Sequence, residues 1–175
     1  MPTLQNGQLF PELKLSAVGG GTLSLPGDLA GSYGIVLIYR GSWCPYCNAQ
    51  LAAFSRAQGA LEEVDARVVA LSVDDEATTA ALIEKRRLGF PIGHSADAAA
   101  VSAAVGAYTN SDPVYLESTG FVLAPDGTVL TAVLLQWRDR SADADDVLGL
   151  LAISSPTVNG APRGTYAPPS RGLRD

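Results

Sequence analysis

The sequence predicts an α/β protein, a three-layer α/β/α sandwich built around a mixed central sheet. Two continuous apolar runs rich in β-branched residues, at 34–39 and 67–73, are each followed by a helical stretch. Strands of this kind are buried on both faces and pair in parallel beneath covering helices. A later pair of apolar runs flanks the turn Pro125-Asp-Gly127, which indicates a hairpin and therefore antiparallel strands. Strand–helix alternation followed by a hairpin gives a mixed sheet between helical layers.

The N-terminal third is expected to supply an edge hairpin and the first central strand. In residues 1–31, leucines alternate with polar residues on either side of Gly19-Gly20-Gly21, which predicts a marginal hairpin at the edge of the domain. The run Gly34–Tyr39 is expected to be a central strand. A helix should follow it and run to about Gly59.

The rest of the chain continues the alternation of strands and helices. The second buried strand, Arg67–Val73, leads into a helix from about Asp75 to Leu88. This helix begins with acidic residues and ends with basic ones, as the helix dipole favours. A short extended piece is expected at Phe90–Ile92 and a short helix at Asp97–Val105. The hairpin should comprise Gly120–Ala124 and Thr128–Gln136, and a terminal helix should span Asp143–Ile153.

The chain of 175 residues is expected to form one domain over residues 1–153, followed by a tail over residues 154–175. The tail is rich in Pro, Gly, Ser and Arg and lacks an apolar pattern that would build its own core. Hydrophobic residues make up 47% of the chain and charged residues 17%, which excludes a chain that is disordered as a whole.

Charge and cysteine content exclude several classes of function. With 12 basic and 18 acidic side chains the net charge is −6, which disfavours nucleic acid or an anionic membrane as a partner. No apolar run approaches the roughly 18 residues that span a bilayer. Because Met1–Phe10 lacks the features of a secretory signal, we expect a cytoplasmic protein. Two cysteines and one histidine are too few for a four-ligand zinc site, and no metal is expected.

The motif that carries chemistry is Cys44-Pro-Tyr-Cys47, placed where a buried strand meets a helix. Cys44 should lie at the helix N-terminus, where unpaired backbone N–H groups and the helix dipole stabilise a thiolate. Pro45 suits the first helical position, and Cys47 follows about one turn later, within reach of a disulfide. In a reducing compartment such a pair is more often reactive than structural. We therefore predict an exposed Cys44 nucleophile with a lowered pKa and a more buried Cys47 that resolves it.

A buried inert pair and a purely structural disulfide are the alternatives to a redox site. Near the motif, Arg40 is the closest cation in sequence and is expected to lower the pKa of Cys44 or to orient a substrate oxygen. Trp43 and Tyr46 flank the cysteines and are expected to contact a substrate or partner. For these three residues the alternative is an ordinary place on the surface or at the edge of the core. His94 reads as a loop histidine.

The segment Tyr39–Leu51, with the residues YRGSWCPYCNAQL, resembles the active-site segment of peroxiredoxin-like proteins of the alkyl hydroperoxide reductase/thiol-specific antioxidant group. These proteins have the thioredoxin fold, and the likeness extends from about Leu9 to Ile153. The resemblance implies a thioredoxin-like domain in which Cys44 is the attacking, peroxidatic cysteine and Cys47 is the resolving one. Further pieces of the pattern are Leu9–Pro11, Val69–Asp74, Phe90–Ile92 and Thr119–Gly127.

The chain departs from the usual pattern at several positions. Leu37 and Gly41 replace the proline and threonine that peroxiredoxins place before the reactive cysteine, and Ser118 replaces an arginine of the later strand. The groups that align and polarise a peroxide are thus missing from their usual places. Thr119 holds the position of the thioredoxin cis-proline. The resemblance places Ser118 and Thr119 across from Cys44, and Thr119 joins the candidate substrate-binding residues.

The function predicted first is that of a thiol peroxidase. Cys44 attacks a hydroperoxide and becomes a sulfenic acid, Cys47 condenses with it to a disulfide, and a thioredoxin- or glutaredoxin-type dithiol protein reduces that disulfide without any cofactor. The second hypothesis is a glutaredoxin- or thioredoxin-like thiol–disulfide oxidoreductase, because the Pro-Tyr dipeptide resembles that of glutaredoxins. The third is a non-catalytic binding module that responds to oxidation. The expected partners are a hydroperoxide or disulfide, a dithiol reductant and, in a homodimer, a second copy of the chain.

Overall fold

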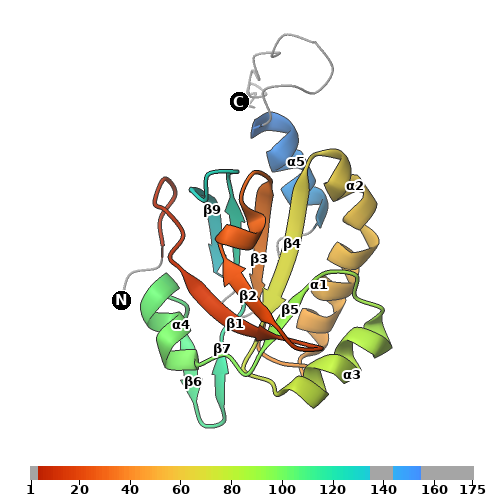
Figure 1. Cartoon of the computed structure of the whole chain (residues 1–175), viewed down its shortest axis with the longest axis vertical. Coiled ribbons are helices and arrows are strands. Elements are labelled where there is room, and N and C mark those ends of the chain that lie inside the picture. The colour runs from red at the N-terminus through yellow and green to blue at the C-terminus, as the bar shows by residue number, and fades with distance from the viewer. Residues whose placement is uncertain (1–3, 135–143, 155–175) are drawn as a thin grey trace, which may run out of the picture.

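The main feature of the computed structural model is a seven-stranded mixed sheet with the strand order β2-β1-β5-β4-β3-β8-β9 (Figure 1). The structure describes residues 4–134 and 144–154. Strands β6 and β7 form a separate two-stranded sheet. In chain order the elements are β1 (Leu13–Ala17), β2 (Thr22–Leu25), the 3-10 helix η1 (Gly27–Leu29), β3 (Tyr33–Ile38), α1 (Pro45–Arg56), α2 (Gln58–Glu63), β4 (Ala66–Leu71), α3 (Glu76–Arg86), β5 (Ile92–His94), α4 (Ala98–Val105), β6 (Thr109–Ser111), β7 (Val114–Leu116), β8 (Thr119–Leu123), β9 (Val129–Leu134) and α5 (Ala144–Ser154).

Strand β3 lies at the centre of the sheet, as the sequence predicts. It pairs in parallel with β4 on one side and antiparallel with β8 on the other. Its residues from Ile35 to Ile38 are all buried, as expected for a strand covered on both faces. Strands β4 and β5 are also parallel, whereas the β1–β2, β1–β5 and β8–β9 pairs are antiparallel. The predicted mixed sheet is therefore confirmed.

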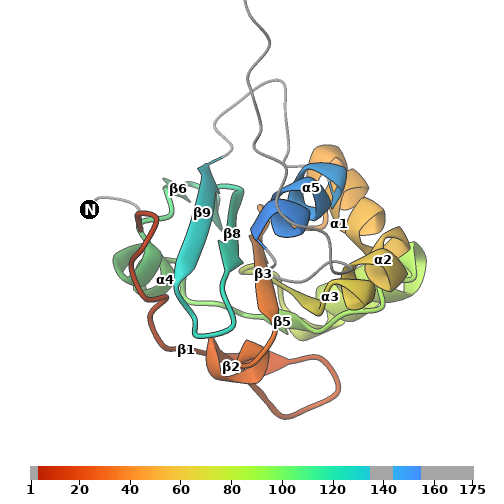
Figure 2. The same cartoon turned by 90° about the horizontal axis from the view of Figure 1, so that it is seen from above.

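Two hydrophobic clusters lie on the two faces of the sheet. Helices α1, α2, α3 and α5 contribute to one cluster, and Figure 2 shows them together on one side of β3. Helix α4 lies on the other side of the sheet in Figure 2 and shares its cluster with the β1–β2 hairpin. The three-layer sandwich is thus confirmed. Its outer layers are unequal in the described part of the chain, because one consists of helices and the other of one helix and a hairpin.

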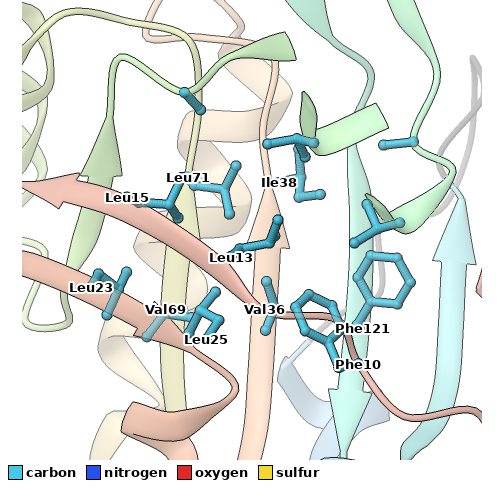
Figure 3. Packing of buried hydrophobic residues seen from close by; sticks show 14 of the residues in the cluster. Phe10, Leu13, Leu15, Leu23, Leu25, Val36, Ile38, Val69, Leu71 and Phe121 are labelled. Atoms are coloured by element: carbon cyan, nitrogen blue, oxygen red, sulfur yellow. The ribbon is translucent and has the colours of Figure 1, made fainter. Parts of the chain in front are cut away.

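The β1–β2 hairpin builds part of the core as well as the edge of the sheet. Its leucines gather with Val36 of β3 in one cluster (Figure 3). Beside them the rings of Phe10 and Phe121 meet edge to face, with their centres 5.4 Å apart. Burying one leucine side chain contributes roughly 1.5–3 kcal/mol to stability. The hairpin therefore closes the face of the sheet that α4 leaves open, with the buried residues Leu13, Leu15, Leu23 and Leu25.

Helices α3 and α4 both begin at aspartate caps, close to their predicted starts. The side chain of Asp75 accepts a hydrogen bond from the backbone N–H of Thr78 at 2.8 Å. The side chain of Asp97 accepts from the N–H groups of Ala99 and Ala100 at 2.9 and 3.1 Å. Such caps satisfy backbone donors that the first helical turn leaves unpaired.

The structure differs from the expectation chiefly in two elements; in addition, the short extended piece predicted at Phe90–Ile92 is strand β5, which begins only at Ile92 and ends at His94. The single helix predicted to end near Gly59 is two helices, which meet at Ala57, and Gly59 lies inside the second. The break lets α2 bury Leu61 against the sheet. The β6–β7 hairpin is not predicted from the sequence, because its strands are three residues long and largely exposed. Strands this short lack a readable alternation of apolar and polar residues.

The terminal helix is present as α5, although Asp143, its predicted first residue, lies outside the described residues. Almost all of the predicted tail, from residue 155 onward, also lies outside them, so the domain boundary after residue 153 stays a prediction. None of the helices in residues 4–134 and 144–154 is both long enough and apolar enough to cross a lipid bilayer.

Candidate active site

Cys44 lies between the end of β3 and the start of α1, in the position that the sequence predicts. Its Sγ accepts a hydrogen bond from the backbone N–H of Cys47 at 3.2 Å, and Pro45 occupies the first position of the helix. Its carbonyl accepts the next helical hydrogen bond, from the N–H of Asn48 at 3.0 Å. The sulfur thus takes the place of the side-chain oxygen of an ordinary N-cap residue. The unpaired N–H groups of the first turn favour a negative charge at this place.

Both cysteines are buried, which corrects the prediction of an exposed Cys44 and a more buried Cys47. Each is a free thiol that is 3% exposed. Burial, followed by the hydrogen bond with the Cys47 thiol, raises the pKa of Cys44 to about 11. The Cys47 backbone N–H and the charge of Arg40 act in the opposite direction and are outweighed. The predicted lowering of this pKa is therefore wrong for the reduced protein, because desolvation exceeds the effect of the helix N-terminus.

The opposite wall of the site is formed by the connection between β7 and β8. Ser118 is buried there, and its Oγ lies 3.4 Å from Sγ of Cys47. Thr119, the first residue of β8, pairs with Ile38 at the end of β3. Its hydroxyl donates a hydrogen bond to the carbonyl of Glu117 at 3.2 Å. The resemblance places Ser118 and Thr119 across from Cys44; in the structure Ser118 contacts Cys47 instead, and the Thr119 hydroxyl is hydrogen-bonded to the Glu117 carbonyl.

Arg40 and Glu117 form an ion pair at this site. Nη2 of Arg40 lies 2.6 Å from Oε2 of Glu117, and Nε donates to the same oxygen at 2.7 Å. The guanidinium carbon is 5.7 Å from the centre of the Tyr115 ring, within the range of a cation–π interaction. The charge of Arg40 lowers the pKa of Cys44, in the predicted direction, but it is the smallest of the influences on that thiol. Glu117, which sequence reasoning missed, competes for the guanidinium.

The two aromatic residues that flank the cysteines are exposed, as expected of residues that contact a substrate or partner. Trp43 is 55% exposed and Tyr46 is 85% exposed. The Trp43 ring meets the Tyr115 ring edge to face, with the centres 5.2 Å apart. Because Tyr115 belongs to β7, the β6–β7 hairpin reaches the loop that carries Trp43. Sequence reasoning missed Tyr115 together with its hairpin.

Two side chains hold the backbone of Ser42, two residues before Cys44. The N–H of Ser42 donates to Oδ2 of Asp74 at 2.7 Å, and its carbonyl accepts from Nδ2 of Asn48 at 2.8 Å. Asp74 follows β4, and the carboxyl ends of the parallel strands β3 and β4 lie side by side. An acidic residue soon after the second buried strand was therefore a usable signal, because loops at this edge of a parallel sheet commonly meet.

Comparison with known proteins agrees with this geometry. The AhpC/TSA family matches residues 6–132, well over half of the chain. The chain belongs to the AhpC/TSA family. It is accordingly a peroxiredoxin-like protein with a thioredoxin-like fold, as the resemblance of the active-site segment implies.

Two curated relatives, both named peroxiredoxin, show how far the likeness reaches. The protein from Chlorobaculum tepidum is 34% identical over 74 residues, which cover 42% of this chain and 34% of that protein. The protein from Methanothermobacter thermautotrophicus is 24% identical over 151 residues, which cover 83% of this chain and 70% of that protein. The match thus spans only about a third of the first relative's length.

Two solved structures share the fold. Peroxidoxin BcpB from Mycobacterium tuberculosis superimposes with a TM-score of 0.76 at 23% identity, over 85% of this chain and 97% of that one. Mycobacterium tuberculosis AhpC gives a TM-score of 0.74 at 22% identity, over 91% and 98% of the two chains. At these identities the likeness shows the fold alone.

In this peroxiredoxin-like chain, Gly41 occupies the position of the usual threonine, and the structure gives a reason for the absence of a side chain there. A Cβ atom at Gly41 would lie 2.5 Å from Nε1 of Trp43 and 3.1 Å from Oδ1 of Asp74. Real Cβ atoms do not approach other atoms as closely as the first of these distances. The indole of Trp43 therefore occupies the space that a side chain at position 41 would need.

His94 contacts the hydroxyl of Ser95, with Nδ1 3.0 Å from Oγ. It belongs to β5, where it pairs with Ser16 of β1. The prediction of a loop histidine is therefore wrong in its placement, because His94 is the last residue of strand β5. In the part of the chain that the structure describes, no group of three or more His, Cys, Asp and Glu side chains is arranged to hold a metal ion.

Proposed function

We propose that this protein reduces hydroperoxides with Cys44 as the attacking cysteine and Cys47 as the resolving one. The observation that carries the proposal is the position of Cys44 at the N-cap of α1, with the Cys47 N–H on its sulfur. This arrangement offers a donor to a thiolate and keeps the second thiol one helical turn away. Membership of the AhpC/TSA family supports the same reaction.

In the first step, the Cys44 thiolate attacks one oxygen of the hydroperoxide. An S–O bond forms and the O–O bond breaks, so the cysteine becomes a sulfenic acid and the other oxygen leaves as an alcohol or water after taking up a proton. We assign contact with the substrate to Arg40, Trp43, Tyr46 and Thr119. Because the pKa of Cys44 is about 11, the thiolate is a minor form at neutral pH in the reduced, buried state.

In the second step, Cys47 condenses with the sulfenic acid and releases water. The resulting Cys44–Cys47 disulfide is then reduced by a dithiol protein of the thioredoxin or glutaredoxin type, through a mixed disulfide. Neither step requires a metal or organic cofactor. We place this cycle in the cytoplasm, where thiols are kept reduced.

A second candidate function is thiol–disulfide exchange with a protein or glutathione disulfide. The observation that favours it is the pair of exposed aromatic rings, Trp43 and Tyr46, beside buried thiols. Exposed aromatic side chains are common at protein contacts, and a protein disulfide would need such a contact surface. The same cysteines would serve, with Cys44 again as the attacking group.

The deciding experiment is stopped-flow oxidation of the reduced protein by hydrogen peroxide, an organic hydroperoxide and glutathione disulfide. For a peroxidase we expect a second-order rate with a peroxide well above that of an ordinary thiol at the same thiolate fraction. Cys44→Ser should abolish the reaction, and Cys47→Ser should allow one oxidation without turnover. An ordinary rate with peroxide and a fast one with glutathione disulfide would establish the second function. No turnover with any dithiol donor would leave the redox-responsive binding module.

A further inference from the structure

The hydroxyl of Ser118 contacts the sulfur of Cys47, the resolving cysteine of the proposed cycle. Its Oγ lies 3.4 Å from Sγ of Cys47. Ser118 is 8% exposed and Cys47 is 3% exposed, so the contact is buried. The sulfur of Cys44 has a different partner, the backbone N–H of Cys47. The Cys44 sulfur is also hydrogen-bonded to the Cys47 thiol, whereas the Ser118 hydroxyl contacts Cys47.

The position of Ser118 is fixed by the residues on both sides of it. Before it, Glu117 is held by the ion pair with Arg40 and by the hydrogen bond from its N–H to the carbonyl of Tyr108 at 2.8 Å. After it, Thr119 is paired with Ile38 in the sheet. A hydroxyl held in this way is preorganised and needs little rearrangement when charge develops on Cys47.

We propose that Ser118 is a catalytic residue of the resolving step, where its hydroxyl stabilises the thiolate of Cys47. This inference rests on the proposed peroxidase function. With Cys47 as a thiol, either atom of the pair can donate the hydrogen bond. Once Cys47 has lost its proton, only the Ser118 hydroxyl can donate, and the hydrogen bond to a charged acceptor is the stronger one.

The step balances without any other oxidant or reductant. Sγ of Cys47 attacks the sulfur of the Cys44 sulfenic acid, an S–S bond forms, and the S–O bond of Cys44 breaks. The hydroxide that leaves takes up the proton that Cys47 has lost, and the product is water. Cys47 is oxidised while Cys44 is reduced from sulfenic acid to disulfide. Ser118 keeps its own proton throughout, because it acts as a donor and not as a base.

The test compares Ser118→Ala and Ser118→Thr with the unchanged protein in two separate measurements. Sulfenic acid is trapped with dimedone after mixing with hydrogen peroxide, and disulfide formation is followed by rapid quench across a pH series. Ser32→Ala is the matched control, because Ser32 is also buried and its hydroxyl donates to Asp65 at 2.9 Å, at the far end of β3.

In Ser118→Ala we expect the first oxidation to keep its rate within about twofold, since the hydroxyl contacts Cys47 and not Cys44. Disulfide formation should slow about tenfold or more at pH 7, because a hydrogen bond to a charged group is lost. The pH midpoint of that step should move upward and trapped sulfenic acid should accumulate. Ser118→Thr should restore the rate, and Ser32→Ala should change neither measurement.

An unchanged rate and pH profile of disulfide formation in Ser118→Ala would overturn the inference while leaving the proposed function intact. Equal slowing in Ser118→Ala and Ser32→Ala would also overturn it, because the hydroxyl would then act only through stability. If the unchanged protein gives neither sulfenic acid nor disulfide with peroxide, the proposed function fails first and the role of Ser118 fails with it.

Discussion

At Cys44, opposing influences act on a single sulfur. The Cys47 N–H and the charge of Arg40 favour the thiolate, whereas burial and the Cys47 thiol favour the neutral form and raise the pKa to about 11. Alkylation requires the thiolate. We therefore expect the rate of Cys44 alkylation by iodoacetamide to rise about tenfold per pH unit between pH 7 and 10. Site-resolved mass spectrometry of the reduced protein measures this rate, and a plateau below pH 8 would contradict the expected profile.

Arg40 acts on the same thiol from outside the motif. Arg40→Met removes a charge that lowers the pKa of Cys44, so this pKa should rise. Because Arg40 is the smallest of the influences, we expect alkylation and peroxide oxidation at pH 8 to slow by only about two- to threefold. Arg56→Met is the control, since Arg56 is exposed in the last turn of α1. Equal rates in all three proteins would show that Arg40 leaves the reaction unaffected.

Glu117 should have the opposite effect, because its carboxylate neutralises the guanidinium at 2.6 Å. In Glu117→Gln the charge of Arg40 is no longer compensated, and the pKa of Cys44 should fall. We expect alkylation at pH 8 to become about two- to fivefold faster. A slower reaction would mean that Glu117 serves to position Arg40, and the double variant with Arg40→Met separates the two cases.

At the scale of elements, the site depends on how the loop before α1 is fastened to the loop after β4. The side chain of Asp74 accepts a hydrogen bond from the N–H of Ser42, and the side chain of Asn48 donates one to the carbonyl of Ser42. Asp74→Ala should leave that N–H unpaired, so amide hydrogen exchange at Ser42 and Cys44 should accelerate and peroxide oxidation of Cys44 should slow. Nuclear magnetic resonance and stopped-flow measurements follow the two effects.

Asp97→Ala provides the comparison for this variant. It also removes an aspartate that accepts backbone N–H groups, but at the start of α4. Asp97→Ala should lose about 0.5–2 kcal/mol of stability, as helix-cap substitutions do, and Asp74→Ala should lose about 1–3 kcal/mol, because it leaves a backbone donor unpaired. Only Asp74→Ala should change the oxidation rate. Similar rates in the two variants would reduce the role of Asp74 to ordinary structural support.

The elements that could be predicted from the sequence are those marked by a local pattern, either a continuous run of apolar residues or a strong turn sequence. β3 and β4 are runs of apolar side chains, and the β8–β9 hairpin surrounds a strong turn sequence. The β6–β7 hairpin has no such pattern, and it carries Tyr115, which contacts Trp43. Glu117 follows the same hairpin. The partners of Trp43 and Arg40 could therefore not be predicted from the sequence, because these contacts join segments that are distant in sequence.

At the scale of the whole molecule, the same distinction explains the error at Cys44. Its place at the N-terminus of α1 follows from local sequence and was predicted correctly. Its pKa depends on how completely the rest of the fold covers the sulfur, and the cluster around the cysteines draws residues from β3, β4, α3 and α5. The sequence around Cys44 does not show how completely the folded chain buries its sulfur. Desolvation by the assembled fold then outweighs the dipole of one helix.

The burial of Cys44 should also appear in the stability of the whole protein at high pH. The thiol loses its proton near its ordinary pKa of 9.0 in the unfolded chain and near 11 in the folded one. Below pH 9 both states hold the proton, and between pH 9 and 11 only the folded state does. The free energy of unfolding must therefore fall as the pH rises through this window, by at most about 2–3 kcal/mol from Cys44.

Urea unfolding of the reduced protein and of Cys44→Ser at intervals from pH 8 to 11 isolates this contribution. The pKa of Tyr39 is also raised, first of all by burial, so its ionisation also lowers the free energy of unfolding at high pH. This effect should be the same in both proteins. The stability of Cys44→Ser should consequently fall less steeply above pH 9, and the two curves should converge or cross as the pH approaches 11. Parallel curves would mean that the folded protein does not hold the Cys44 proton more tightly than the unfolded chain. In that case the thiol would titrate near its ordinary pKa of 9.0, and the rate of alkylation would level off near pH 9 instead of continuing to rise to pH 10.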